Sequence, residues 1–198
     1  MKKVKYWLLS VGGILFAIIY GSMSDRDSTL SKLEAVAEQG DVNAQYALGL
    51  MYYYGEHVEV DYKQAKLWYE KAASNDDSRA QVKLGEMYAN SIGVNQDYQQ
   101  SKSWYEKAAA QNDVDAQFLL GEMYDNGNGV KQDYHQARAW YEKAAAQNDV
   151  QAQFDLGVMN ERGQGGSINT EQARSWYERS CVNGVKEGCE RYKALSGK

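Results

Sequence analysis

The sequence predicts an all-α fold: a right-handed α-solenoid of four 36-residue helix-turn-helix repeats with half-repeat caps. Three residue pairs recur at a spacing of 36 residues and never shift register. They are Ala-Gln beginning at Ala44, Ala80, Ala116 and Ala152, Leu-Gly beginning at Leu48, Leu84, Leu120 and Leu156, and Trp-Tyr beginning at Trp68, Trp104, Trp140 and Trp176. A fixed period of this length is typical of proteins whose units stack, because one unit cannot bury its apolar face alone.

The first element, residues 1–24, has the layout of a secretory signal peptide. Three lysines precede an apolar run over residues 7–20, and small residues lead to a cleavage position expected after Ser24. The alternative is an uncleaved membrane anchor, because the apolar stretch and its flanks approach the ~17 residues that span a bilayer. Both alternatives place the rest of the chain outside the cytoplasm, either in the periplasm (free or anchored to the inner membrane) or secreted.

The solenoid domain is expected over 25–198, and its elements follow the repeat in order. A helix over 27–39 aligns with the second helix of a repeat and forms the N-terminal cap. The repeats span 42–77, 78–113, 114–149 and 150–185. In each, apolar residues at steps of three and four predict two helices, and glycine-rich letters such as "DNGNG" predict the turn between them. A last helix over 185–195 aligns with a first helix and forms the C-terminal cap.

Two further patterns support the helical hairpins. A residue that can cap a helix stands before each second helix, at Asp61, Asp97, Asp133 and Asn169. Small residues recur where the two helices of a hairpin approach, and a larger side chain there would force the helices apart. These are Gly49, Gly85, Gly121 and Gly157 on the first helices, expected to face Ala65, Ser101, Ala137 and Ala173 on the second.

The charge balance argues against nucleic acid as a partner. The formal net charge is −5 at pH 7, and it becomes −8 if residues 1–24 are removed, because that segment holds three lysines and no acid. An acidic body of this kind repels phosphate backbones. Contact with a membrane is expected only through an uncleaved N-terminal segment.

Three motifs at this period resemble a known family. An "A-Q-x-x-L-G-x-M-Y" helix, a "G-x-G-V-x-x-D" turn and an "A-x-x-W-Y-E-K-A-A" helix are similar to the Sel-one-like repeat (SLR), a relative of the tetratricopeptide repeat found in exported bacterial proteins. The resemblance covers nearly all of the chain after the signal peptide. Its departures lie in the turns, where His57 and Ser91 replace glycines and "RGQGGSINT" is altered throughout. The resemblance implies a scaffold for protein complexes.

The two cysteines, Cys181 and Cys189, have the spacing C-x7-C. In the cysteine-rich bacterial members of the family, a pair at this spacing ties neighbouring helices together. The resemblance therefore implies a disulfide that pins the C-terminal cap and an oxidising compartment. Two buried thiols are the alternative. A metal site is disfavoured, because two cysteines without a nearby histidine give too few ligands.

The sequence offers no catalytic constellation. His57 and His135 lie in or beside turns of different repeats, and nothing pairs either one with a nucleophile. The motifs H-E-x-x-H, G-x-S-x-G and S-x-x-K are missing from the chain. We therefore expect a protein that is not an enzyme and has no catalytic residues, metal or cofactor. Because some related cysteine-rich proteins are linked to β-lactam binding, a β-lactam-binding or hydrolysing enzyme is a third hypothesis.

A partner-binding surface is predicted where the repeats differ most. In tetratricopeptide-like stacks the first helices line the concave face, so the variable positions of these helices are expected to form a binding groove for a protein partner. The groove residues are Tyr46, Leu50, Tyr53, Tyr54, Val82, Glu86, Asn90, Asp115, Phe118, Glu122, Asp125, Phe154, Val158 and Glu161. An apolar column with acidic flanks suits a partner that carries apolar anchors and basic residues. The alternative is that the column only packs between adjacent first helices.

Two functional hypotheses follow. The first is an exported adaptor that holds a partner protein or peptide in its concave groove, such as a host protein or a member of an envelope complex. The second is a periplasmic immunity protein that neutralises a cognate toxic effector, a role that some small exported SLR proteins have. A neighbouring gene that encodes a phospholipase or another toxin would favour the second.

Overall fold

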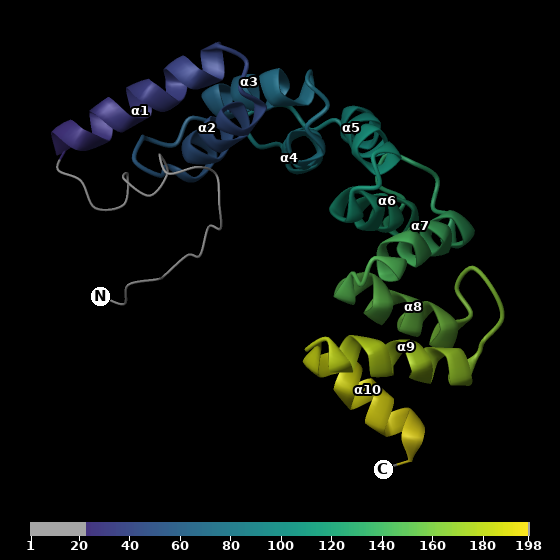
Figure 1. Ribbon diagram of the computed structural model, residues 1–198. Helices are drawn as coiled ribbons and strands as arrows, with labels where there is room; N and C mark the ends of the chain where they lie inside the picture. The colour runs from purple at the N-terminus through teal and green to yellow at the C-terminus, as the bar shows by residue number, and fades with distance from the viewer. Residues whose placement is uncertain (1–22, 198) are drawn as a thin grey trace. The chain divides into compact units, whose positions relative to one another are not determined.

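The protein is all-α in the part of the chain that the structure describes. The computed structural model describes residues 23–197 and holds ten helices and no strand among them (Figure 1). The helices are α1 (Met23–Glu38), α2 (Val42–Tyr54), α3 (Tyr62–Ala73), α4 (Ser78–Asn90), α5 (Tyr98–Ala110), α6 (Val114–Asn126), α7 (Tyr134–Ala146), α8 (Val150–Arg162), α9 (Thr170–Val182) and α10 (Lys186–Ser196). The predicted all-α solenoid is confirmed. The signal-peptide prediction falls on residues 1–22, outside the described residues, and the expected cleavage position after Ser24 falls within the first turn of α1.

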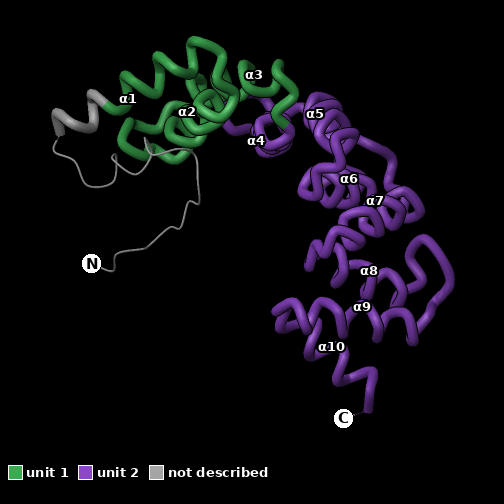
Figure 2. The backbone as a smooth tube through the Cα atoms, in the orientation of Figure 1, with its two compact units in different colours: residues 1–77 green, residues 78–198 purple. Residues whose placement is uncertain are grey.

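The chain divides into two compact units (Figure 2). Unit 1 ends at Asp77 and contains α1, α2 and α3, whose core includes Leu33, Ala37, Leu48 and Trp68. Unit 2 begins at Ser78 and contains α4 to α10. Within unit 2, α4/α5, α6/α7 and α8/α9 form hairpins, α5 packs on α6, α7 packs on α8, and α10 packs on α9. Each hairpin thereby covers an apolar face of the next.

Aspartate and asparagine side chains begin most of the helices. The predicted caps of the second helices are confirmed: Asp133, for example, accepts hydrogen bonds from the backbone N–H groups of His135 (2.9 Å) and Gln136 (3.1 Å). The structure adds caps on first helices that the sequence reading missed. Asp113 and Asp149 accept from the N–H groups of Ala116 (3.0 Å) and Ala152 (2.7 Å). These bonds satisfy amides that a helix leaves without an internal partner.

The turns between the two helices of a hairpin keep the same backbone conformation at positions where their residues differ. His57 and Ser91, which replace glycines of the repeat, have φ of 66° and 58°. The glycines at the matching positions of the third repeat, Gly129 and Gly127, have φ of 68° and 74°. The left-handed conformation is therefore imposed on two non-glycine residues by the turn, at some cost in backbone strain.

A tyrosine ring fills the space that each seam glycine leaves. A Cβ added to Gly121 would lie 2.5 Å from ring atoms of Tyr141, and the other three repeats place a tyrosine in the same way. The expectation that these glycines face Ala65, Ser101, Ala137 and Ala173 stays a prediction, and the structure adds the tyrosine as the nearest neighbour. Those four residues are fully buried, but the atoms nearest to the glycine belong to the tyrosine four residues further on.

Buried glutamines connect the two helices of each hairpin in unit 2. Gln81, Gln117 and Gln153 are 2–3% exposed. Each accepts a side-chain hydrogen bond of 2.9 Å from the end of the helix before the next hairpin or cap, donated by Gln111, Gln147 and Asn183 respectively. In unit 2 the glutamine of the Ala-Gln pair thus satisfies its buried carbonyl oxygen in every hairpin. The carbonyl oxygen of Gln45 in unit 1 is buried without such a bond in the described residues.

The C-terminal cap is held by a disulfide and an ion pair. Cys181 of α9 and Cys189 of α10 are bonded, with their Cα atoms 4.5 Å apart, as the resemblance implies. Arg191 of α10 lies 3.3 Å from the Glu161 carboxylate of α8. Both links fasten α10 to the last hairpin.

Candidate protein-interaction surface

The predicted surface residues lie on α2 in unit 1 and on α4, α6 and α8 in unit 2. In unit 1, Tyr46, Leu50 and Tyr53 are partly buried and Tyr54 is exposed. In unit 2, Asn90 and Asp115 are exposed, and the rest are partly buried except one. The partly buried set is Glu86, Phe118, Glu122, Asp125, Phe154, Val158 and Glu161. The relation between the α2 residues and those of unit 2 stays a prediction.

Val82 is the exception, and we remove it from the surface. It is 5% exposed and belongs to the core cluster that contains Tyr105 and Leu120. The same repeat position holds Phe118 and Phe154, whose longer side chains extend far enough to stay partly exposed. A valine at this position ends within the core.

The aromatic column packs within its own hairpins. The Phe118 ring lies 5.6 Å from the Tyr141 ring, and the Phe154 ring lies 5.6 Å from the Tyr177 ring. In unit 1, Tyr46 lies 5.9 Å from Tyr69 in the same relation. Each ring is thus held by the seam tyrosine of the second helix. Phe118 also packs against the core cluster that contains Leu156 and Met159 of α8, so the packing towards the next first helix that the alternative assumed is present as well. One part of each phenylalanine stabilises the hairpin and the other part stays accessible.

Three carboxylates gather around Tyr141, from two helices. Glu122 and Asp125 belong to α6, and Asp155 belongs to α8. Burial, followed by the charges of Glu122 and Asp125, raises the pKa of Asp155 to about 7. Burial also raises the pKa of Glu122, with Asp125 contributing. We call Phe118, Glu122, Asp125, Phe154 and Asp155 the acidic-aromatic face.

The ion pairs beside this face lie at its two ends. At the α4 end, Lys83 pairs with Glu86 (2.7 Å) and lowers the otherwise raised pKa of Asp115. At the other end, Arg191 pairs with Glu161, which also accepts a 2.6 Å hydrogen bond from the Tyr177 hydroxyl. Between them, Glu122, Asp125 and Asp155 make no ion pair with any residue of the described chain. The centre of the face therefore holds three carboxylates without an ion-pair partner in the described residues, and Arg162 is the basic residue that lowers the raised pKa of Asp125 there.

Asp155 was missed by the sequence reading. The same repeat position holds Lys83 and Leu119, so its variation between repeats was a usable signal. The position is not among the predicted groove residues, and the structure shows that its side chain lies close enough to Glu122 and Asp125 of α6 for their charges to raise its pKa.

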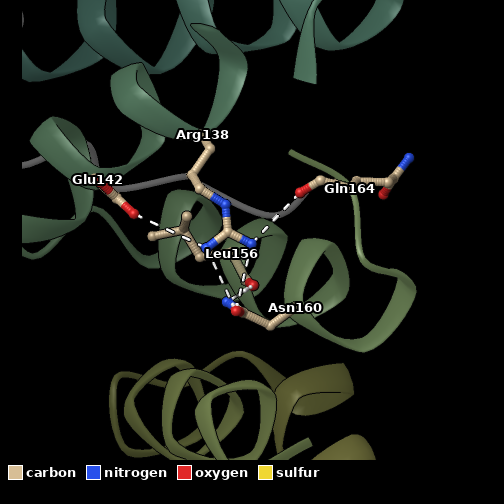
Figure 3. Close-up of polar contacts among 5 residues, drawn as sticks. All are labelled: Arg138, Glu142, Leu156, Asn160 and Gln164. Atoms are coloured by element: carbon tan, nitrogen blue, oxygen red, sulfur yellow. Dashed lines mark hydrogen bonds and ion pairs between the residues drawn. The ribbon is translucent and has the colours of Figure 1, made fainter. Parts of the chain in front are cut away.

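A second missed group joins α7 to α8 (Figure 3). The Arg138 guanidinium donates to the Asn160 side-chain oxygen at 3.3 and 3.4 Å and to the Gln164 carbonyl oxygen at 3.4 Å, and it lies 4.0 Å from Glu142. Asn160 is 1% exposed and donates to the Leu156 carbonyl oxygen. The other repeats have tyrosine at the Asn160 position. We interpret this group as part of the packing between α7 and α8, because the buried asparagine and the arginine bonded to it occupy the place of a tyrosine ring.

No constellation for catalysis or metal binding is found in the described residues. His57 and His135 lie in separate units, and both are exposed. No group of three or more His, Cys, Asp or Glu residues has a geometry that would hold a metal, within residues 23–197. A hollow of about 490 Å³ between α5, α6 and α7 is lined by Trp140, Lys143 and Glu106, away from the acidic-aromatic face. No helix of the described chain is long and apolar enough to cross a bilayer.

The comparison with protein families decides the classification. The model of the Sel1 repeat matches four consecutive segments, residues 42–77, 78–113, 114–149 and 150–184. The chain belongs to the Sel1 repeat family. Proteins built from Sel1 repeats are protein-interaction modules, and the fold is generally a non-enzymatic scaffold. No curated protein sequence matches the chain.

Solved Sel1 repeat structures agree with this assignment. A protective antigen of uropathogenic Escherichia coli that displays an SLR fold is 36% identical, with a TM-score of 0.81 over 85% of this chain. This chain spans only 36% of that protein's length. A Sel1 repeat protein from Oxalobacter formigenes is 33% identical, with a TM-score of 0.79 and coverage of 86% of this chain and 70% of that one. Cysteine rich protein B of Helicobacter pylori is 29% identical, with a TM-score of 0.53 and coverage of 69% and 98%.

Proposed function

We propose that the chain is an exported adaptor that holds a protein partner against the acidic-aromatic face of unit 2. The observation that carries the proposal is the group of three partly buried carboxylates at the centre of this face, which have raised pKa values and form no ion pair in the described chain. Burying carboxylates beside one another disfavours their charged forms and lowers the stability of the fold. A hairpin stack does not require this arrangement, since the equivalent positions of the second repeat are Val82, Glu86 and Ala89.

The partner chemistry follows from the same residues. Lysine or arginine side chains of a partner would neutralise Glu122, Asp125 and Asp155, and an apolar side chain would cover the accessible parts of Phe118 and Phe154. Opposite charge across an interface raises the association rate and selects the partner, and a buried aromatic contact contributes affinity. The flanking residues Glu86, Asn90, Asp115, Val158 and Glu161 are proposed to border this contact.

Export is supported by two features. The Cys181–Cys189 disulfide is stable in an oxidising compartment and rare in a reducing one. Residues 1–24 have the layout of a signal peptide. Fusing alkaline phosphatase to the C-terminus tests this part, because that enzyme is active only when it is exported and oxidised. An inactive fusion that accumulates in the cytoplasm contradicts export.

The test of the face uses substitutions that keep the shape of the side chains. In Glu122→Gln with Asp125→Asn, the repulsion with Asp155 is removed, so the fold is expected to be at least as stable as the wild type. Capture of the partner from the native envelope by the full-length chain is expected to fall at least tenfold, measured by quantitative mass spectrometry. The matched control is Glu106→Gln with Glu142→Gln, two exposed glutamates of the second helices.

The control is expected to capture the partner as well as the wild type. If the control loses the partner while the variant of the face retains it, the acidic-aromatic face is not the binding site. The identity of the captured protein separates an adaptor from an immunity protein: a toxic effector whose activity is blocked indicates the latter.

A further inference from the structure

Exposed apolar side chains gather in unit 1, where α2 ends and α3 begins. Tyr54 is 57% exposed, Val60 is 52% exposed and Tyr62 is 39% exposed. The Val60 side chain lies against Gly55, the residue after Tyr54. Together with Tyr53, these residues form what we call the tyrosine cluster: Tyr53, Tyr54, Val60 and Tyr62. Adjacent exposed apolar residues of this size mark interaction sites more often than single ones do.

The exposed rings are fixed from the inside. The Tyr53 ring lies 4.9 Å from the Tyr54 ring and 5.5 Å from the Tyr62 ring, with interplanar angles of 71° and 69°. Tyr53 also lies 6.4 Å from Tyr69, which is fully buried. Edge-to-face contacts of this kind stabilise the arrangement before any partner binds. Rigid tyrosines lose little conformational entropy on binding, which suits them to anchor an interface.

The other repeats show that the fold does not require these apolar residues. At the position of Val60, Gln96 and Gln132 close the turn by donating hydrogen bonds to the carbonyl oxygens of Ala89 (2.8 Å) and Asp125 (2.6 Å). Valine cannot make this bond. The position of Tyr54 holds Asn90, Asn126 and Arg162 in the other repeats. The first repeat therefore replaces a stabilising hydrogen bond and a polar surface residue with exposed apolar groups.

The charges around the cluster select the partner. Glu56, Glu59 and Asp61 lie in the turn between Tyr54 and Tyr62, all exposed. The segment 53–63 has one lysine, Lys63, one histidine, His57, and no arginine. Tyrosine faces attract cations, and an arginine guanidinium stacks flat on a ring while it hydrogen-bonds to carboxylates. Aromatic faces bordered by carboxylates are complementary to an arginine side chain.

We infer that the tyrosine cluster of unit 1 is a docking surface for an arginine-bearing extended segment of a protein partner. The inference shares with the proposed function only that the partner is a protein, since it concerns a different unit and different residues. An arginine of the segment stacks on the Tyr54 and Tyr62 rings, its guanidinium pairs with Glu56 or Glu59, and a neighbouring apolar group covers Val60.

The probe is a set of synthetic nonapeptides with the repeat Arg-Ala-Pro, and versions in which arginine is replaced by lysine, glutamate or alanine. Binding to the full-length chain is measured by fluorescence polarisation at low salt. The arginine peptide is expected to bind at least tenfold more tightly than the glutamate and alanine peptides, and more tightly than the lysine peptide.

The decisive variant is Tyr54→Asn with Val60→Gln, which installs the residues that the third repeat uses. It is expected to weaken the arginine peptide at least tenfold while its melting temperature does not fall, because Gln at position 60 restores the turn hydrogen bond. The matched control is Gln132→Val in unit 2, which is expected to lower the melting temperature and leave peptide binding unchanged.

Three outcomes overturn the inference. The first is an arginine peptide that binds no more tightly than the glutamate peptide. The second is peptide binding that survives Tyr54→Asn with Val60→Gln but is lost in Glu122→Gln with Asp125→Asn, which leaves the proposed function intact. The third is a dimer of the chain, seen by analytical ultracentrifugation, that this Tyr54 and Val60 variant dissociates, because the occupant would then be a second copy. If no partner is captured from the envelope while the arginine peptide still binds in a way that depends on Tyr54, the proposed function is contradicted and this inference is not.

Discussion

Asp155 has carboxylates as its main charged neighbours and only partial access to water, which makes it the most strongly perturbed acid of the described chain. Burial, followed by the charges of Glu122 and Asp125, raises its pKa to about 7. An unfolded aspartate has a pKa near 3.9. Between these two values the native state binds more protons than the unfolded state, so the free energy of unfolding decreases as the pH rises through this window.

Replacing Asp155 with Asn should remove this pH dependence. At pH 8 the variant is expected to be more stable than the wild type by about 2 to 4 kcal/mol, since three pKa units correspond to about 4 kcal/mol before the surroundings relax. At pH 4, where Asp155 is neutral in the native state, the two proteins should differ by less than about 0.5 kcal/mol. Denaturant unfolding at pH 4, 6 and 8 measures both. An equal pH slope in the two proteins would show that Asp155 is ionised at low cost.

Gly121 tests the seam between the helices of a hairpin. A Cβ on Gly121 would lie 2.5 Å from the Tyr141 ring, which is 1% exposed and has no room to move. Alanine in a helix normally gains up to about 1 kcal/mol over glycine, but overpacking should outweigh this and lower the free energy of unfolding by about 1 to 3 kcal/mol. Thermal and denaturant unfolding measure the loss.

The matched control is Gly166→Ala. The nearest atom to a Cβ there is an Arg138 nitrogen at 3.7 Å, an ordinary contact. We expect this variant to stay within about 0.5 kcal/mol of the wild type. If Gly121→Ala is as stable as the wild type, the Tyr141 ring shifts to make room for the methyl group without a loss of folding free energy.

At the scale of the element, the helices and turns could be predicted because the same sequence pattern occurs in all four repeats. The caps of the second helices, Asp97 and Asp133 among them, were recognised from aspartates that precede an apolar period. The caps Asp113 and Asp149 recur just as regularly but are harder to recognise, because each lies within a few residues of the end of the preceding helix. The glycine–tyrosine contact could not be derived from spacing, since it depends on the direction of the tyrosine side chain.

The disulfide should determine how firmly α10 is attached. Replacing Cys181 and Cys189 with Ala is expected to lower the free energy of unfolding by about 2 to 3 kcal/mol, the loop-entropy value for a link across so few residues. Amide exchange in α10 should accelerate more than exchange in α6 or α7, because only Arg191 would then fasten the cap to α8. Wild-type protein treated with a reductant is the control and should behave like the variant. Unchanged exchange in α10 would show that packing on α9 alone holds the helix.

For the whole molecule, the repeat predicts the scaffold and leaves the binding surface open. Phe118 and Phe154 were identified because they lie where the repeats vary, and the structure adds that each rests on a seam tyrosine. Val82 lies in the same column and is buried. The sequence could not predict this, because a valine side chain is shorter than a phenylalanine side chain and ends inside the core. The role of Asp155 depends on how α8 packs beside α6. The spacing of residues within one helix gives no information on this packing.

The charge of the whole chain gives a prediction for partner association. With 27 acidic and 22 basic residues, and with carboxylates at the acidic-aromatic face that form no ion pair in the described chain, the protein should attract a basic partner over distances of about one Debye length, roughly 10 Å at 0.1 M salt. Stopped-flow measurements with the captured partner should therefore show an association rate that falls at least tenfold between about 0.02 and about 0.5 M salt. A decrease on the order of tenfold or more is typical of electrostatically steered association. Glu122→Gln with Asp125→Asn should flatten this dependence, whereas Glu106→Gln with Glu142→Gln, which removes the same charge from the second helices, should flatten it less. Equal slopes in these two variants would show that net charge, and not the acidic-aromatic face, steers the partner.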